Sequence, residues 1–250
     1  MLVHDAPGPC PYIDGEIARL PFRLPVRRLE PDELDERLRA GDRRQGAFLY
    51  RPDCPSCRAC IPLRLDVNEF VEGRTHRRIL RRGVRELRVE AGRPLVDDRR
   101  VELYNLHRRA RGLDLERAPI SADGYREFLG RSSCDSFELR FSREGRLVAV
   151  AIVDRSAEAL SAVYCHYDPA ILDLSPGTFS ILVQVALCRA WGLRHLYLGL
   201  YVEGSEIMEY KARFLPHERR VDGAWQKITE YRAPAPRRAP GQRTPTPPTP

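Results

Sequence analysis

The stretch SPGTFSILVQVALCRAWGL, residues 175–193, and the stretch HLYLGLYV that follows it, residues 195–202, decide the fold. Residues 178–191 predict a helix that is apolar almost all round and is therefore buried. Residues 195–202 predict a strand whose apolar character places it in the centre of a sheet. A buried helix that leads directly into a central strand indicates a sheet with a helix packed on its face.

Three further strands are predicted upstream of this unit. Residues 137–141 and 147–154 are joined by a short turn, and residues 159–167 continue the meander. Helices are predicted at residues 101–111 and 121–129. The sequence therefore predicts an α+β fold, with a mixed sheet and packed helices, for a C-terminal domain at residues 96–232.

Residues 1–95 predict a separate and less regular N-terminal region that contains most of the cysteines. Residues 233–250 consist mainly of Pro, Arg, Thr and Ala, and a segment without apolar residues to bury is expected to be disordered. The elements predicted in the N-terminal region are a helix at 32–40 that Gly41 ends, strands at 47–50, 63–67 and 84–90, and a helix at 74–82 that Gly83 ends.

The chain carries a formal net charge of +7, and all but two of its 42 basic residues are arginine. Arginine pairs with phosphates and carboxylates through two parallel hydrogen bonds, so a polyanionic partner fits this composition. Genomic base composition can enrich arginine as well, and the excess alone leaves both explanations open. No signal peptide is recognisable, and no stretch approaches the roughly 20 apolar residues of a membrane span. The sequence predicts a cytoplasmic protein.

Three cysteines at intervals of three, in the segment CPSCRAC, are the most distinctive local pattern. This spacing matches three ligands of an iron-sulfur cluster, and four thiolates suit structural zinc equally well. The alternative is that they are reduced thiols of the core. The candidate metal ligands are Cys54, Cys57 and Cys60, with Cys10 as the fourth.

The run RTHRRILRR, residues 74–82, predicts a helix with one face made of guanidinium groups. Its five arginines fall within an arc of about 140° at 100° per residue. The run contains no acidic residue, which favours a contact with phosphates over a merely solvated surface. The candidate residues are Arg74, Arg77, Arg78, Arg81 and Arg82.

Two other segments have residues suited to chemistry. The small residues of SPGTF open a helix whose backbone amides could receive an oxyanion or a phosphate, and plain helix capping is the alternative. In MEYKARFLPHE, residues 208–218, Lys211 with its neighbours Glu209 and Tyr210 could orient an ester or a carboxylate. No catalytic triad, Walker loop or dinucleotide fingerprint is present.

Taken together and in order, these motifs resemble the aminoacyl-tRNA–protein transferases of the N-degron pathway. The details follow the bacterial aspartate/glutamate leucyltransferase branch, which is related to the eukaryotic arginyltransferases. The motifs that carry the resemblance are CPY at 10–12, YRPDCPSCRACIPLRLDVNEF at 50–70, RTHRRILRR at 74–82, LSAVYCHYDP at 160–169, YLGLYV at 197–202 and MEYKARFLPHE at 208–218.

The resemblance implies an acetyltransferase-like C-terminal domain that moves an amino acid from tRNA to the α-amino group of a protein beginning with Asp or Glu. It implies no cofactor for the chemistry and leaves zinc or an iron-sulfur cluster at the four cysteines as an option. The acceptor's acidic side chain would meet Lys211 or an arginine among Arg74, Arg77 and Arg78, while Arg81 and Arg82 would contact the tRNA. The site would further contain Tyr164, Tyr167, Asp168, Ser175, Gly177, Thr178, Glu209 as the proton-transfer residue, and Tyr210.

The transferred amino acid is the point that the sequence leaves open. An apolar pocket would select leucine, and a carboxylate-lined pocket would select arginine, for which Glu203, Glu206 and Glu209 leave room. The bacterial motif details favour leucine. Two other hypotheses are a non-catalytic, metal-stabilised RNA-binding protein and an acetyltransferase that uses a small thioester.

Overall fold

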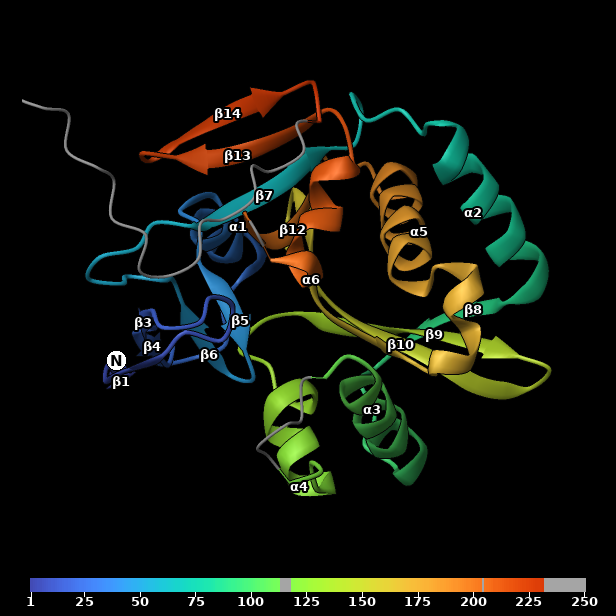
Figure 1. The fold of residues 1–250 in the computed structure, drawn as a ribbon, viewed down its shortest axis with the longest axis horizontal. Coiled ribbons are helices and arrows are strands. Elements are labelled where there is room, and N and C mark those ends of the chain that lie inside the picture. The colour runs from blue at the N-terminus through green and yellow to red at the C-terminus, as the bar shows by residue number, and fades with distance from the viewer. Residues whose placement is uncertain (113–117, 204, 232–250) are drawn as a thin grey trace, which may run out of the picture.

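The computed structural model describes residues 1–112, 118–203 and 205–231, so the predicted tail at 233–250 lies outside the described residues. An eight-stranded sheet forms the centre of the molecule (Figure 1). Its strands are β7 (Cys60–Asp66), β8 (Arg88–Gly92), β9 (Ser136–Arg143), β10 (Arg146–Arg155), β11 (Ala159–Tyr167), β12 (His195–Val202), β13 (His217–Val221) and β14 (Ala224–Ile228).

The strand order is β14-β13-β7-β12-β11-β10-β9-β8, and only β11 and β12 form a parallel pair. Parallel neighbours require a crossover, which here is helix α5 (Pro176–Ala190) preceded by the 3-10 turn η2 (Pro169–Leu174). β12, buried along its whole length, therefore lies inside the sheet, as its apolar sequence predicted.

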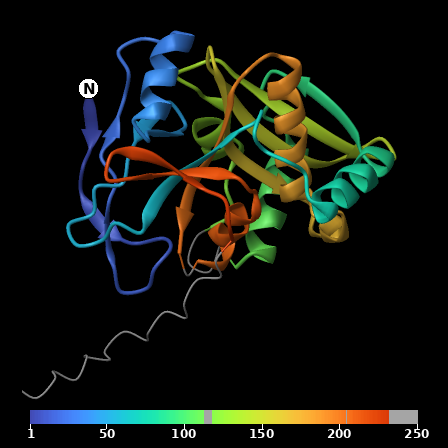
Figure 2. The same ribbon diagram turned by 90° about the horizontal axis from the view of Figure 1, so that it is seen from above.

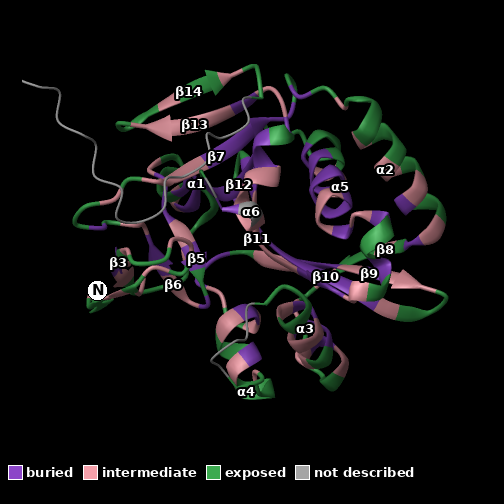
Figure 3. Ribbon diagram, in the orientation of Figure 1, coloured by how far each residue is buried: buried purple, intermediate pink, exposed green. Residues whose placement is uncertain are grey.

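Helix α5 packs on one face of the sheet, with α2 (Arg74–Glu86) alongside it (Figures 1 and 2). Phe179 of α5 is fully buried in the main core beside Phe141 of β9, and Figure 3 shows that most of α5 is buried. Neither α5 nor any other helix in the described parts of the chain is long and apolar enough to cross a membrane.

The opposite face of the sheet is covered by α3 (Asp98–Ala110), by α4 (Ala122–Tyr125) and by the π-helical turn η1 (Arg126–Gly130) that continues it (Figure 1). Tyr104 of α3 and Tyr125 of α4 pack there against Val150 and Ile152 of β10. Successive residues of a strand point to opposite faces, so β10 contributes Ala149, Ala151 and Val153 to the α5 side instead. Each helical layer thus buries one face of the same sheet.

The N-terminal residues form a smaller layer beside the large sheet (Figure 1). Arg44 joins the two parts, because its guanidinium donates to both carboxylate oxygens of Asp154 on β10 at 2.7 and 2.8 Å, with both side chains only 2% exposed. The elements of this layer are α1 (Pro31–Arg39), a sheet of order β1-β4-β6-β5 made of Leu2–His4, Phe22–Arg23, Phe48–Tyr50 and Arg43–Gln45, and the pair β2 (Pro7–Pro9) and β3 (Ile17–Arg19).

The predicted fold class, an α+β mixed sheet with packed helices, is confirmed. The prediction that Gly83 ends a helix is wrong, since α2 continues to Glu86 and Gly83 is buried against Phe179 inside it. The predicted strand at 84–90 is consequently displaced to β8. Strands β7 and β8 come from the first 95 residues and lie in the large sheet, and the domain boundary after residue 95 stays a prediction.

Candidate functional site

A cavity of about 530 Å³ opens where the parallel strands β11 and β12 separate. The two strands pair only from Ala159 to Ser161 and from His195 to Tyr197, and beyond this point the side chains of β11 line the cavity. The described lining residues on β11, α5, α6 (Glu206–Glu209) and η3 (Tyr210–Arg213) include Tyr164, Cys165, Tyr167, Ser175, Gly177, Thr178, Ser180, Gln184, Met208, Tyr210 and Lys211.

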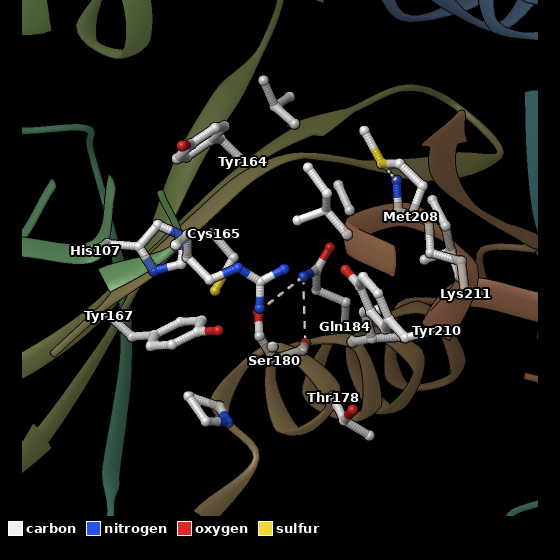
Figure 4. A pocket seen from close by; sticks show the side chains of 18 of the residues that line it. His107, Tyr164, Cys165, Tyr167, Thr178, Ser180, Gln184, Met208, Tyr210 and Lys211 are labelled. Atoms are coloured by element: carbon white, nitrogen blue, oxygen red, sulfur yellow. Dashed lines mark hydrogen bonds between the residues drawn. The ribbon is translucent and has the colours of Figure 1, made fainter. Parts of the chain in front are cut away.

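Figure 4 shows how these elements surround the cavity. His107, Tyr164 and Tyr167 lie on one side, Met208, Tyr210 and Lys211 lie on the other, and the first turns of α5 form the floor between them. The two sides come from segments more than 40 residues apart in the sequence, and only the folded sheet brings them together.

The start of α5 gives the cavity a backbone donor surface. Ser175 adopts a left-handed conformation with φ of 53°, and the first intrahelical hydrogen bond runs from the amide of Phe179 to the carbonyl of Ser175 at 2.9 Å. The amides of Gly177 and Thr178 precede this bond, and Gly177 leaves open space around its Cα. SPGTF therefore opens a helix, as predicted. A helix start favours a negatively charged oxygen, and the binding of an oxyanion or a phosphate at this place stays a prediction.

Lys211 is buried in the wall with 8% of its surface exposed. Its Nζ donates to the carbonyl of Leu200 at 2.8 Å and to Sδ of Met208 at 3.1 Å. Burial, together with the nearby charge of Arg43, lowers the pKa of Lys211 to about 7. The amine of Lys211 therefore titrates near neutral pH, and its protonation responds to any charge that enters the cavity.

Tyr164 and Tyr210 are protonated hydrogen-bond donors at neutral pH. Burial raises the pKa of both hydroxyls well above the usual value. Burial also lowers the pKa of His107, with a contribution from Arg111, to about 4, so its imidazole is neutral at pH 7. The ring of His107 packs edge-on against Tyr167 with centroids 4.3 Å apart.

Several polar lining residues had no role in the sequence analysis, among them Arg43, His107, Arg111, Ser180 and Gln184. Gln184 is 2% exposed, and its Nε2 donates to the carbonyl and the hydroxyl of Ser180 while its Oε1 has no hydrogen-bond partner among the described residues. Nothing in the local sequence around these residues marks them, because helices and strands of ordinary composition carry them to the cavity.

Some predicted site residues lie outside the cavity wall. Asp168 caps η2 by accepting from the amide of Ala170 at 3.0 Å, and it accepts from Arg99 at 3.2 Å. Glu209 lies between two lining residues in the sequence but is not part of the lining itself. The five predicted arginines of α2 lie on that helix, outside the cavity, and Arg82 pairs there with Glu86 and with Asp173 of η2.

The four candidate metal ligands lie around Cys60. Burial raises the pKa of the Cys60 thiol to about 12, and the neighbouring Cys10, Cys54 and Cys57 add to the increase. All four are free cysteines. Among the described residues, no three His, Cys, Asp or Glu side chains are arranged as a ready metal-binding group.

Comparison with known proteins adds two family matches that cover most of the chain. Residues 8–78 match the N-terminal sequence model of the arginine-tRNA-protein transferases, and residues 99–221 match the C-terminal one. The chain is 37% identical over 222 residues to an aspartate/glutamate leucyltransferase of Thiobacillus denitrificans, covering 88% of this chain and 91% of the relative. It is 36% identical over 231 residues to a protein of the same name from Chromobacterium violaceum, covering 90% and 93%.

Solved structures with a related arrangement are more distant. The C-terminal domain of a putative lysylphosphatidylglycerol synthetase from Agrobacterium fabrum matches with a TM-score of 0.45 and 15% identity, covering 75% of this chain and 57% of that one. FemX matches with a TM-score of 0.44 and 10% identity, covering 72% and 63%.

Proposed function

The chain belongs to the arginine-tRNA-protein transferase family, and from this premise we propose that it transfers leucine from a charged tRNA to the α-amino group of proteins that begin with Asp or Glu. The added leucine would mark the acceptor for degradation. The structural observation that carries the proposal is the cavity at the start of α5, lined by cations and hydroxyl donors. Since the donor is charged tRNA, we place the reaction in the cytoplasm.

The reaction needs no nucleophile from the protein. The acceptor's amine nitrogen attacks the carbonyl carbon of the aminoacyl ester, a C–N bond forms, and the C–O bond to the ribose breaks. The proton released by the amine is balanced by the one that the ribose oxygen gains. An α-amino group has a pKa of about 7.7 to 8.0, so an appreciable fraction is neutral at pH 7. The protein must therefore mainly align the two substrates and stabilise the oxyanion.

The cavity supplies groups for both tasks. The amides of Gly177 and Thr178 are the proposed oxyanion donors, and the hydroxyls of Tyr164 and Tyr210 can donate to the ester because they stay protonated. Glu209, which stands between the lining residues Met208 and Tyr210 and is not itself part of the lining, remains the proposed proton acceptor. Glu209→Gln should lower kcat and leave the KM for the peptide unchanged.

The wall composition favours leucine over arginine. None of the described lining residues is Asp or Glu, whereas the side chains of Leu172, Ile181, Leu198 and Ile207 are apolar. Burying an arginine side chain without a carboxylate partner would cost free energy, while a leucyl side chain gains from apolar contact. The names of the relatives support the same choice.

A direct assay tests the proposal against a non-catalytic RNA-binding protein. Purified protein is incubated with total charged tRNA and with peptides that begin with Asp, Glu or Ala, and the products are read by mass spectrometry. We expect a mass increase of one leucine on the Asp and Glu peptides only. If arginine is added to the peptides instead, arginine and not leucine is the transferred amino acid. If the protein binds tRNA but modifies no peptide, it is a non-catalytic RNA-binding protein.

The proposal includes a zinc ion or an iron-sulfur cluster at Cys10, Cys54, Cys57 and Cys60, because the first three lie near enough to Cys60 to raise the pKa of its thiol and four thiols are a suitable donor set for either group. Such a metal would fix the loop 54–60 to the chain near residue 10 and would take no part in the acyl transfer. Metal analysis of anaerobically purified protein should find zinc or iron that a Cys57→Ser/Cys60→Ser variant lacks. Equal metal content in both proteins would contradict this part.

A further inference from the structure

Arg43 and Arg44 are neighbours on β5 with opposite environments. Arg44 is fully paired, since it holds Asp154 with two hydrogen bonds and donates to the carbonyls of Gly46 and Arg131 at 2.8 and 3.0 Å. The buried Nε of Arg43 has no hydrogen-bond partner within the described parts of the chain, and no carboxylate described there lies within ion-pair distance of this arginine. Successive residues of a strand point to opposite sides, so the guanidinium of Arg44 lies against Asp154 and that of Arg43 lies against Gly199. Both arginines border the cavity, but the hydrogen-bond donors of Arg44 are already occupied.

The backbone of β12 leaves room for the guanidinium of Arg43. A Cβ at Gly199 would lie 1.2 Å from Nη1 of Arg43, and Gly199 has a φ of +82°, a conformation that other residues rarely adopt. The register between β12 and β7 shifts at this point. Because Gly199 has no side chain, the guanidinium of Arg43 packs directly against the backbone of β12. This contact holds the guanidinium in a fixed position, which suits recognition of a ligand of defined geometry.

Lys211 is the second cation at this place, and its ionisation responds to the charge of Arg43. Arg43 and Lys211, of which Lys211 is only 8% exposed, therefore lie with Arg44 and Arg111 in a wall without a described acidic residue. Buried charges of one sign cost free energy unless an anion enters. The wall thus has the charge expected of a binding site for an anion.

We propose that the guanidinium of Arg43, assisted by the ammonium of Lys211, binds the side-chain carboxylate of the acceptor's N-terminal Asp or Glu. This inference rests on the proposed leucyl transfer and assigns its acceptor specificity mainly to Arg43. The planar guanidinium offers two parallel donors that match a carboxylate. The arginines of α2 cannot take this role from their own helix, because they lie outside the cavity that holds the ester.

The carboxylate is the ligand that fits the remaining geometry. In Asp and Glu the side-chain carboxylate is only a few bonds from the α-amino group, so the cation that binds it must lie in the same cavity as the oxyanion donors. Arg43 and the start of α5 both line that cavity. A phosphate near the 3′ end of the tRNA is the competing anion, and the test separates the two.

The test compares peptides that differ only in charge, beginning with Asp or Asn, in the leucyl-transfer assay. Arg43→Gln keeps a hydrogen-bonding side chain and removes the charge. We expect kcat/KM for the Asp peptide to fall roughly 100-fold, because a buried charge loses its partner. The low rate on the Asn peptide and the KM for leucyl-tRNA should change less than about threefold, so the discrimination between the peptides is lost. Arg43→Lys should restore part of it.

The control is Arg88→Gln, which removes an exposed arginine of β8 that pairs with Glu90 at the surface. It should leave both rates and the discrimination unchanged. The melting temperature and equilibrium binding of tRNA show whether the Arg43→Gln protein is folded. If the folded variant still prefers the Asp peptide over the Asn peptide, the inference is overturned. Equal losses on both peptides with a raised KM for leucyl-tRNA would overturn it in favour of the phosphate. Absence of transfer by the wild-type protein would instead remove the proposed function itself.

Discussion

Gly199 is required for Arg43 to occupy its position in the cavity wall. Its positive φ and the closeness of the Arg43 guanidinium are two separate requirements for glycine, one of the backbone and one of the space beside it. Gly199→Ala should therefore cost about 1–2 kcal/mol of backbone strain and also displace Arg43. We expect the discrimination between Asp and Asn peptides to fall as it does in Arg43→Gln, measured by kcat/KM alongside thermal unfolding.

Gly192 provides the matched control for this prediction. It also has a positive φ, +70°, but an added Cβ would meet nothing within 4 Å. Gly192→Ala should cost a similar free energy of unfolding and leave the peptide discrimination intact. If both variants affected discrimination equally, strain in the backbone rather than the position of Arg43 would be the cause.

Lys211 makes the stability of the protein depend on pH. Its pKa is lowered from 10.5 to about 7 in the folded state, so at pH 7 to 10 the unfolded chain binds more protons than the folded one. The cost of burying the ammonium is therefore complete below about pH 7, decreases as the pH rises and is absent above the unfolded pKa. Lys211→Met should raise the free energy of unfolding by on the order of a few kcal/mol at pH 6.

The difference between Lys211→Met and the wild type should shrink steadily between about pH 7 and pH 10. Urea unfolding at a series of pH values measures it, with Lys227→Met as the control because Lys227 is exposed and pairs with Glu69 at the surface. A gain in stability that is the same at both ends of this pH range would mean that the substitution acts through packing and not through the charge.

Helix α2 is positioned by a glycine that the sequence pattern suggested was its end. An added Cβ at Gly83 would lie 2.3 Å from the ring of Phe179, which is fully buried and also contacts Phe141. In an exposed helix, replacing glycine by alanine stabilises by roughly 0.5–1 kcal/mol. Here we expect Gly83→Ala to destabilise by about 1–3 kcal/mol, since a packed core does not give way easily.

Chemical denaturation of Gly83→Ala checks the sign of this effect. Val84→Ala is the control in the same helix, because Val84 is 64% exposed and its truncation should change stability by less than about 0.5 kcal/mol. Increased stability of Gly83→Ala would indicate that α2 can move away from α5 and that the close approach is not required.

At the scale of elements, the sequence predicted best what depends on a continuous apolar pattern. The residues of α5, β10, β11 and β12 have such patterns, and their order alone indicated the mixed sheet. Strands β5, β13 and β14 were missed because they are short, carry charged residues and gain their stability from partners distant in the sequence. The prediction for Gly83 failed because a helix-ending glycine and a glycine at a helix contact look alike in one sequence.

For the candidate site, too, the sequence indicated the residues that stand in a recognisable local pattern and missed those that only the fold brings together. Tyr164, Tyr167, the SPGTF turn, Tyr210 and Lys211 stood in recognisable motifs, and the structure brings them to one cavity. Arg43 lies in the stretch GDRRQG, where nothing distinguishes it from Arg44. Only the three-dimensional pairing of Arg44 with Asp154 reveals that one arginine is structural and the other is available to a ligand.

Over the whole molecule, the cations of the cavity and the cations of α2 have different surroundings. Arg43 and Lys211 lie in the cavity, whereas Arg74, Arg77, Arg78 and Arg81 of α2 have no ion-pair partner among the described residues. Arg82 is the α2 arginine that pairs with Asp173, next to the turn that leads to Ser175. The arginine-rich helix thus lies beside η2, the segment that leads to the start of α5 and to the cavity.

This division predicts that affinity for tRNA and specificity for the acceptor can be changed independently. Arg77→Gln/Arg78→Gln should weaken tRNA binding and reduce the slope of log K against log salt concentration by about 0.7–0.9 for each phosphate that is no longer neutralised. The preference for Asp over Asn peptides should remain, because neither arginine reaches the cavity. Filter binding at salt concentrations from about 50 to about 200 mM measures the slope.

The control for this prediction is Arg28→Gln/Arg37→Gln, which removes the same number of charges from the N-terminal layer, away from α2. If affinity depended only on the net charge of +7, both double variants would weaken binding alike. If α2 contacts the phosphates directly, only its own variant changes the salt slope, since counterions are released where phosphates are neutralised. An unchanged slope in Arg77→Gln/Arg78→Gln would therefore remove α2 from the tRNA interface and leave the role of the cavity cations as it is.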